Sequence, residues 1–268
     1  MSFGKKLNLQ APKTMNEKIQ WLKLYDRKDI YTTLVDKYAV REWLAKRFGE
    51  EYLIPLLFTT TDYRDIKPEN IPDVPCIIKT NHSSGTNFIC KDKNSVDLAK
   101  LRRKCKRWLK SNFYYHVQEW QYKNIPPRII VEKLLLTHEG KLPNDYKLEF
   151  FNGRLEFVYC SIDREGDNFR NIYSADWKPL NFAWGGHPNR GPEIEPPASF
   201  PKMLEIGSKI AKMFRYVRVD FYDVDGKLYY GEITLHHGSG YDHFSPDSWD
   251  LYWGEKLDLN APVEDDVQ

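Results

Sequence analysis

The spacing of apolar residues predicts helices at the start of the chain. The stretch Thr14-Met15-Asn16-Glu17 has the capping-box pattern, in which a threonine and a glutamate each satisfy a backbone amide at a helix N-terminus. Apolar residues follow at helical spacing as far as Leu24, and a second helical pattern runs from Asp29 to Gly49. Glycine is common just after a last helical turn, so we expect the second pattern to end there.

Apolar runs later in the chain predict strands, and two pairs of runs predict hairpins. The stretch DYKLEFFNGRLEFVYCSID turns at Asn152-Gly153, and YVRVDFYDVDGKLYYGEITLHH turns at Asp225-Gly226. Further strands are expected at 53–58, 76–79 and 128–136. Helices are expected at 96–111, 201–214 and 245–257, and a surface loop rich in Gly and Pro at 179–201. Strands and helices do not alternate regularly, so we predict an α+β fold.

The composition indicates a globular protein without a membrane span. The 268 residues are 41% hydrophobic and 29% charged, and the net charge of only +2 argues against a dedicated nucleic-acid binder. There is no run of about 18 apolar residues, no signal-peptide core, and no CxxC pair, which predicts a cytoplasmic protein with reduced thiols. We divide the chain into a helical N-terminal segment (1–60), a β-rich lid subdomain (61–133), a C-terminal lobe (134–260) and a disordered tail (261–268).

The stretch CIIKTNHSSGTNFICKD contains a lysine at the end of an apolar strand. After Lys79 the chain continues through small polar residues at 81–87 before the next apolar run. Small residues allow backbone amides to approach a phosphate closely. The loop joins two strands and lacks the P-loop pattern, so a phosphate-covering lid and a tight hairpin with an exposed lysine are both open.

Two acids are expected to face each other across the second hairpin. Strand side chains alternate in direction, so Arg218 and Asp220 share one face, and so do Glu232 and Thr234. If the turn at 225–226 closes the hairpin, Asp220 and Glu232 lie close to opposite one another. Two facing carboxylates repel unless a cation or a proton lies between them, and Mg²⁺ suits such oxygens. The alternative is an exposed face on which Arg218 pairs with either acid.

These segments, in this order, resemble the ATP-grasp superfamily and most closely its TupA-like branch, which is tied to bacterial surface polysaccharide and teichuronopeptide synthesis. The resemblance covers roughly residues 10–258 and rests on MNEKIQWLKLYDR, VDKYAVREW, CIIKTNHSSGTNFICKD, RIIVEKLL, DYKLEFFNG, VRVDFYDVDGKLYYGEIT and WDLYWGEKLDL. It implies an ATP-grasp fold in which two α+β lobes clamp ATP, with two Mg²⁺ ions.

The resemblance also implies residue roles. ATP would be bound by Lys37, Lys79, Ser83, Ser84, Gly85, Thr86, Glu132, Lys133, Leu135 and Lys147. The metal ligands would be Asp220, Glu232 and Thr234, and the catalytic groups would be Lys147, which reaches the terminal phosphate, and Arg218, which steadies the transferred phosphoryl group. Many ATP-grasp enzymes have Asn where Thr234 stands.

The implied reaction is a carboxylate–amine ligation through an acylphosphate. It would join an amino acid or amine to a uronic-acid-type sugar, free or linked to a nucleotide or lipid, for capsule or surface polysaccharide. Candidate substrate residues are Arg164, Arg170, His187, Arg190, His236 and Ser239. Arginines suit carboxylate recognition, although solvated surface arginines are the alternative. The His236-His237 pair is either a proton acceptor or structural.

Three other functions remain open, as does the role of the basic helix. Asp223-Val-Asp225 matches the DxD pattern of glycosyltransferases, but Asp also suits the turn itself. The same phosphate apparatus would serve a sugar kinase, and the aromatic residues would serve a glycan-binding module. The basic helix near 100–110 is either a solvated outer face or a docking site for anionic lipid or acidic glycan, which would place the protein at the inner membrane surface.

Overall fold

The computed structural model describes residues 6–186 and 189–265, which divide into two compact units. We call residues 28–135 the four-strand unit, and residues 1–27 with 136–268 the six-strand unit. In the sequence-based division residues 1–60 formed one segment, whereas here residue 28 starts a new unit. No helix in the described part of the chain has the length and apolar character needed to cross a bilayer.

The four-strand unit is an antiparallel sheet with helices around it. The strand order is β1-β4-β2-β3. The strands are β1 (Leu56–Thr60), β2 (Cys76–Thr80), β3 (Asn87–Cys90) and β4 (Ile129–Lys133). The helices are α2 (Ile30–Val35), α3 (Val40–Phe48), α4 (Leu98–Lys110), α5 (Tyr114–Val117) and the short 3₁₀ turns η1 (Glu50–Tyr52), η2 (Tyr63–Asp65), η3 (Pro68–Asn70), η4 (Lys93–Ser95) and η5 (Trp120–Tyr122).

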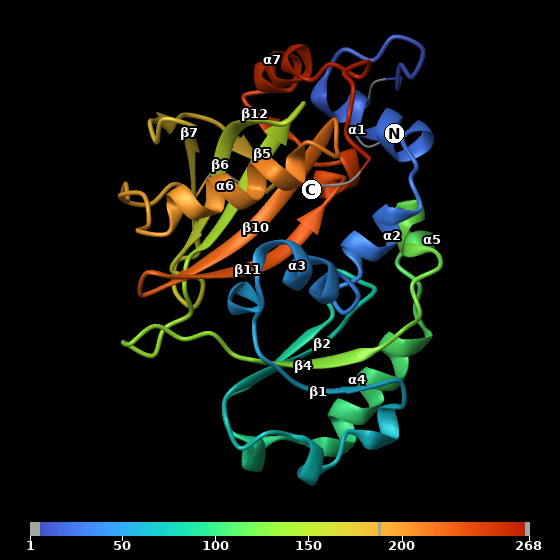
Figure 1. Ribbon diagram of the computed structural model, residues 1–268, viewed down its shortest axis with the longest axis vertical. Helices are drawn as coiled ribbons and strands as arrows, with labels where there is room; N and C mark the ends of the chain where they lie inside the picture. Colours follow the sequence, from blue (N-terminus) through green and yellow to red (C-terminus); the bar gives the residue numbers. More distant parts are fainter. Residues whose placement is uncertain (1–5, 187–188, 266–268) are drawn as a thin grey trace. The chain divides into compact units, whose positions relative to one another are not determined.

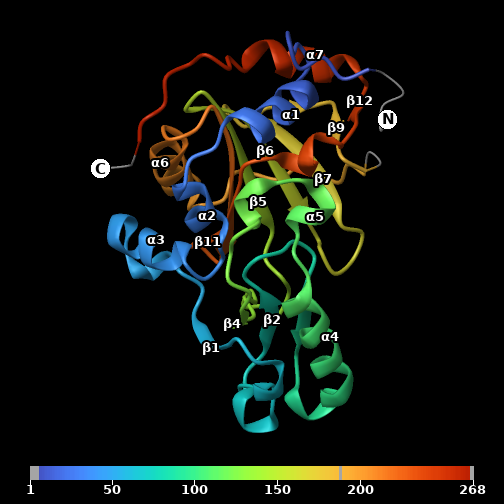
Figure 2. The same ribbon diagram turned by 90° about the vertical axis from the view of Figure 1, so that its right-hand side faces the viewer.

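The two faces of this sheet differ in chemistry. Cys76 and Ile78 share one face with Ile129 and Val131, and α4 packs against it through a buried cluster (Figure 2). Because side chains alternate along each strand, Lys79 and Glu132 lie on the opposite face. Lys79 and Glu132 are therefore directed away from the apolar cluster under α4.

The six-strand unit is built on a second antiparallel sheet, in the order β11-β10-β5-β6-β7-β8. Its strands are β5 (Asp145–Phe151), β6 (Arg154–Ile162), β7 (Phe169–Ser174), β8 (Pro179–Leu180), β10 (Tyr216–Val224) and β11 (Lys227–Thr234), with β9 (Ala183–Trp184) pairing β12 (Phe244–Ser245). Its helices are α1 (Met15–Tyr25), α6 (Phe200–Ala211), α7 (Ser248–Lys256) and η6 (His237–Gly240).

Local sequence signals account for most of these elements. The capping box at Thr14 and Glu17 forms as expected at the start of α1. Both hairpins turn at the expected dipeptides, where Gly153 (φ 78°) and Gly226 (φ 86°) adopt left-handed conformations. The prediction of a loop at 179–201 is wrong in part, because this segment contains the short strands β8 and β9.

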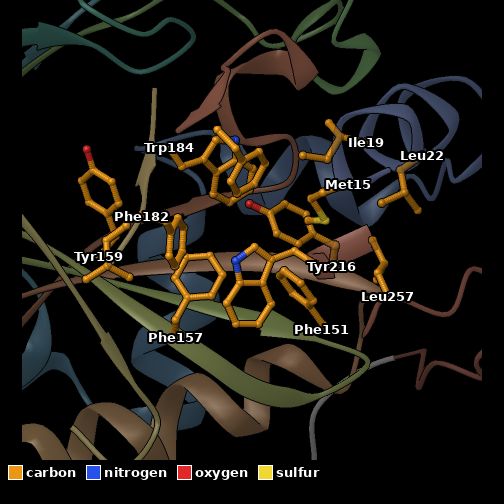
Figure 3. Close-up of a cluster of buried hydrophobic side chains, with 13 residues drawn as sticks. Met15, Ile19, Leu22, Phe151, Phe157, Tyr159, Phe182, Trp184, Tyr216 and Leu257 are labelled. Atoms are coloured by element: carbon orange, nitrogen blue, oxygen red, sulfur yellow. The ribbon is translucent and has the colours of Figure 1, made fainter. Parts of the chain in front are cut away.

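One face of the six-stranded sheet is apolar and covered by α6 (Figure 1). Gly207 of α6 lies so close to the sheet that an added Cβ would come within 2.7 Å of the Phe150 ring. On the other face, near the end of β5, lies an aromatic cluster that includes Phe151, Phe157 and Trp184 (Figure 3). Further along the strands, the same face carries charged residues instead, and these form part of the candidate site.

Candidate functional site

In the four-strand unit, Lys79 is part of a buried ion cluster centred on Glu132. The Lys79 ammonium lies 2.6 Å from one carboxylate oxygen of Glu132, and the Arg41 guanidinium lies 3.2 Å from the other. The side chains of Lys79 and Arg41 are each only 18% exposed, and that of Glu132 is 5% exposed. Lys79 is therefore not the exposed lysine of a simple hairpin. Two cations against one acid leave this cluster with a surplus positive charge.

The loop after Lys79 is fixed at its start and exposed at its tip. The buried Asn81 side chain donates to Asp36 at 2.8 Å and accepts from the Arg128 backbone amide at 2.8 Å. The Lys37 ammonium donates to the Ser83 carbonyl at 3.2 Å, which joins one candidate phosphate ligand to the candidate loop. Ser84 and Gly85 are exposed, while Thr86 is half-buried. The tip of the loop, at Ser84 and Gly85, is thus its most accessible part.

The expected adenine-binding segment, residues 132–135, spans the end of β4. The backbone amides of Lys133 and Leu134 donate to the carbonyls of Pro55 and Pro75 at 2.9 Å. The Lys133 side chain is exposed and Leu135 is half-buried. Two backbone donors of the expected segment are therefore engaged within the four-strand unit.

In the six-strand unit, the two expected acids are register partners and Arg218 lies between them. Asp220 faces Glu232 across β10 and β11. The Arg218 guanidinium makes a bidentate contact with Asp220 at 2.7 and 2.8 Å and reaches Glu232 at 3.1 Å. The Arg218 side chain is only 11% exposed. Arg218 thus pairs with both acids, as the alternative expected, on a face where Asp220 is buried and Glu232 is 34% exposed.

A third carboxylate, Asp145, joins this cluster. The Lys147 ammonium contacts Asp145 and lies 3.9 Å from Asp220. Within the described residues, the buried Oδ1 of Asp145 accepts no hydrogen bond. Sequence reasoning missed Asp145, although strand alternation places it on the face of Lys147, which the sequence did identify. Three carboxylates here share two cations.

Burial sets the ionisation of Asp220. Desolvation raises the pKa of the Asp220 carboxyl to about 6. Arg218 and Lys147 lower this pKa, and the like charges of Asp145 and Glu232 raise it. A cation that approached this carboxylate would lower its pKa again. The cluster is therefore a place where an added positive charge is favourable.

The carboxylates fit an ion that is shared with a phosphate better than a closed metal site. No set of three His, Cys, Asp or Glu side chains in the described chain has an arrangement that could hold a metal by itself. Mg²⁺ commonly takes one or two protein carboxylates and completes its shell with water and phosphate oxygens. Asp220, Glu232 and the unpaired oxygen of Asp145 suit that role. Thr234 lies beside them, opposite Arg218 in the ladder.

A glycine bulge next to the acids was also missed. The pairing of β10 with β11 shifts between Asp220 and Phe221, leaving Gly231 as an extra residue. A Cβ at Gly231 would lie 2.9 Å from the Asp220 carbonyl oxygen, so only glycine fits without a shift. The sequence signal was a lone glycine inside the apolar run LYYGEIT.

Beside this cluster, His237 lies between two further acids. Its Nδ1 is 3.0 Å from the fully buried Glu149 and its Nε2 is 3.5 Å from Asp242, while Trp184 stacks on the ring at 3.8 Å. A neutral ring has one N–H, so a second carboxylate would face a lone pair. Burial opposes the charge, but the hydrogen bonds to Asp242 and Glu149 outweigh it and raise the pKa of His237. The same Nδ1 also lies 3.5 Å from the Arg218 guanidinium, so the ring belongs to the network of charges around Asp220.

The candidate substrate residues lie in different surroundings. His236 and Ser239 are buried, and Ser239 accepts from the Lys23 ammonium at 3.0 Å. Arg170 contacts Asn168, and Arg190 pairs with Glu193 at 3.0 Å. His187 lies outside the described residues.

Arg164 lies beside the Asp223–Asp225 motif. It lines a cavity of about 560 Å³ to which Asp223 and Asp225 also contribute. Asp223 accepts from the Gly226 amide at 2.7 Å, and Asp225 pairs with His138 at 2.7 Å. These contacts are those of turn and loop residues, as the alternative explanation of the DxD pattern expected. A second cavity, of about 610 Å³, is lined by α1, α7 and residues 240–247.

Several solved structures resemble this chain at low sequence identity. Among solved structures, the D-alanine–D-alanine ligase of Helicobacter pylori shares 14% identity (90% of this chain, 67% of that chain, TM-score 0.47). The Bacillus anthracis D-alanine–D-alanine ligase with ATP shares 17% (75% and 56%, TM-score 0.45), and the ATP-grasp ligase PsnB with Mg and ADP shares 12% (77% and 51%, TM-score 0.44).

The chain spans about half the length of the PsnB structures. No curated protein matches it. The family described as "TupA-like ATPgrasp" matches residues 17–258, nearly the whole chain. The chain therefore belongs to the TupA-like ATP-grasp family and has its α+β ATP-grasp fold.

Proposed function

We propose that this protein is an ATP- and Mg²⁺-dependent carboxylate–amine ligase that works through an acylphosphate. The observation that carries the proposal is the family match over residues 17–258. The residues add chemical support, because the Glu132 cluster has surplus positive charge for phosphate and the Asp220 cluster has surplus carboxylate for a metal. These are the two charge types that phosphoryl transfer from ATP requires.

In the first step, a substrate carboxylate oxygen attacks the γ-phosphorus and ADP leaves. Lys37, Lys79 and the backbone of residues 83–86 bind phosphate oxygens, and Glu132 with the segment to Leu135 binds the adenosine. Lys147 and Arg218 offset the charge of the transferred group. Asp220, Glu232 and Thr234 would hold Mg²⁺, which when bound would neutralise the phosphates.

In the second step, an amine nitrogen attacks the acylphosphate carbon. The tetrahedral oxyanion then collapses, inorganic phosphate leaves, and the nitrogen loses a proton. Arg218 is the cation suited to the oxyanion, because Asp220 and Glu232 fix its guanidinium. Acylphosphates hydrolyse readily, so the loop at 81–87 serves to exclude water.

The proposed substrates are an amino acid or amine and a uronic-acid-type sugar of a capsule or other surface polysaccharide, joined in the cytoplasm at the inner membrane surface. The support is the family's link to such polymers. Arg164, Arg170 and Arg190 are the candidate carboxylate ligands. The sugar is free or carried on a nucleotide or lipid.

An isotope experiment separates this proposal from its alternatives. The protein is incubated with ATP, Mg²⁺, common amino acids and uronic acids whose carboxylates carry ¹⁸O. We expect ADP, an amide, and inorganic phosphate containing one ¹⁸O atom. A sugar kinase would form a sugar phosphate without free phosphate, and a glycosyltransferase would consume a sugar nucleotide and leave ATP intact. Unlabelled phosphate beside an amide would contradict the acylphosphate.

A further inference from the structure

The four-strand unit carries all of its surplus charge on one helix. The unit has 20 Lys and Arg residues against 13 Asp and Glu, an excess of seven. Helix α4 contains seven Lys and Arg and no acid. The rest of the unit is balanced. The surplus is thus neither a general property of the unit nor a consequence of the Lys79 cluster.

The position of α4 is fixed by its apolar face. Leu101 and Cys105 are buried, and Leu98, Trp108 and Leu109 pack against the same cluster. The cations are therefore directed away from the core. Five of them are exposed: Lys100, Arg103, Lys106, Arg107 and Lys110.

The cations of α4 have no acidic partner among the described residues. Arg102 donates to the Ile66 carbonyl at 2.7 Å, and the ammonium groups of Lys104 and Lys106 lie over the rings of Phe88 and Tyr63. No ion pair joins the described part of the chain to any α4 cation. Seven uncompensated charges repel one another, so the helix is stabilised by any surface that supplies anions.

The shape and composition of this face indicate what that surface is. Lys100, Arg103, Arg107 and Lys110 follow one stripe about 15 Å long. The one aromatic residue of the helix, Trp108, packs inward rather than offering a stacking platform for bases. A straight stripe of charge without a groove fits a plane of anions better than a polymer strand.

We propose that α4 docks the protein on an anionic lipid bilayer through electrostatic contact alone. Its apolar face is used within the unit, so insertion of side chains between lipids is not needed. Each Lys or Arg near an anionic leaflet strengthens binding about fivefold. Lys79 and Glu132 lie on the other face of the sheet, so docking leaves the proposed phosphate ligands uncovered.

Vesicle sedimentation tests this proposal with the full chain. We expect the protein to sediment with vesicles of phosphatidylcholine and 30% phosphatidylglycerol at ~50 mM salt, to stay in solution with phosphatidylcholine alone, and to be released near 0.5 M salt. The variant K100Q/R103Q/R107Q/K110Q should bind at least tenfold more weakly. Gln is a good helix former, and circular dichroism and a thermal melt confirm the fold.

A matched control removes as many charges elsewhere. The variant K178Q/K209Q/K212Q/K227Q changes four exposed lysines of the six-strand unit and should bind vesicles within twofold of the wild type. Equal binding by both variants, or no binding of the wild type at low salt, overturns the proposal. Tighter binding to duplex DNA or polygalacturonate than to vesicles overturns it in favour of a polymer. ATP binding by the α4 variant should be unchanged, which separates this test from that of the ligase.

Discussion

Around Glu132 in the four-strand unit, two cations bracket one acid, whereas around Asp220 in the six-strand unit three acids share two cations. Both clusters are buried, so each charge matters more than on a surface. One unit is suited to phosphate and the other to a metal ion, and each can be tested separately.

The largest effect should come from Arg218→Met. This change leaves Asp220 and Glu232 facing each other without their shared cation, which costs about 3–5 kcal/mol of stability. The pKa of Asp220 should rise further, because Arg218 is the main group that lowers it. Urea unfolding measures the stability, and ADP formation, where it is detected, should fall at least 100-fold.

Unfolding measured with and without Mg²⁺ tests the same acids without requiring an assay of enzyme activity. In Arg218→Met, Mg²⁺ should raise the unfolding midpoint more than in the wild type, because the ion replaces the missing cation between the acids. Arg218→Lys keeps the charge but not the bidentate contact and should fall in between. If Mg²⁺ stabilises both proteins equally, Asp220 and Glu232 are not its ligands.

Lys79→Ala tests the positive cluster. Glu132 keeps only Arg41, so the surplus positive charge disappears, and ATP should bind about 10- to 100-fold more weakly by isothermal titration. Lys46→Ala is the control, because Lys46 forms an exposed pair with Glu42 on α3 and should leave binding unchanged. Unchanged ATP affinity in Lys79→Ala would contradict the proposal that the Glu132 cluster of the four-strand unit binds phosphate.

His237→Gln tests whether a charged histidine stabilises the six-strand unit. The pKa of His237 is raised in the folded state, so its charge stabilises the fold below the unfolded pKa of about 6.5, and this contribution is lost as pH rises through the folded pKa. The variant should lose about 1–3 kcal/mol at pH 6, and less above the folded pKa.

Urea unfolding of both proteins from pH 6 to 9 measures this difference. The comparison cancels Asp220, whose raised pKa is common to both. His138→Gln is the control: its pair with Asp225 is exposed, so its removal should have no measurable effect. A His237 difference that stays constant with pH would show that packing on Trp184, not charge, is what the ring supplies.

Strand alternation and turn chemistry were enough to predict much of this arrangement. Asp220 and Glu232 were expected to lie close to opposite one another because the Asp225-Gly226 turn closes the hairpin. The turn alone would pair Asp220 with Gly231, and the bulge at Gly231, which was not predicted, is what brings Glu232 opposite Asp220. The contacts between distant segments were not predictable in the same way. His237 meets Glu149, 88 residues away, and nothing local to either marks the other. Asp145 was missed for a different reason. Its strand was identified, but whether its carboxylate oxygen is hydrogen-bonded depends on tertiary contacts that the sequence does not show.

The smallest expected effect is that of Thr234→Asn, at the position where many ATP-grasp enzymes have asparagine. An amide oxygen is a better Mg²⁺ ligand than a hydroxyl, and Thr234 stands opposite Arg218 beside the acids. We expect two- to threefold tighter Mg²⁺ dependence of ADP formation, with stability unchanged. Thr32→Asn, in α2 of the four-strand unit, is the matched control and should leave the Mg²⁺ dependence unaltered. If Thr234→Asn instead weakens Mg²⁺ dependence, the threonine is adapted to this chain's own cluster, in which Arg218 takes the space that a second ion would need.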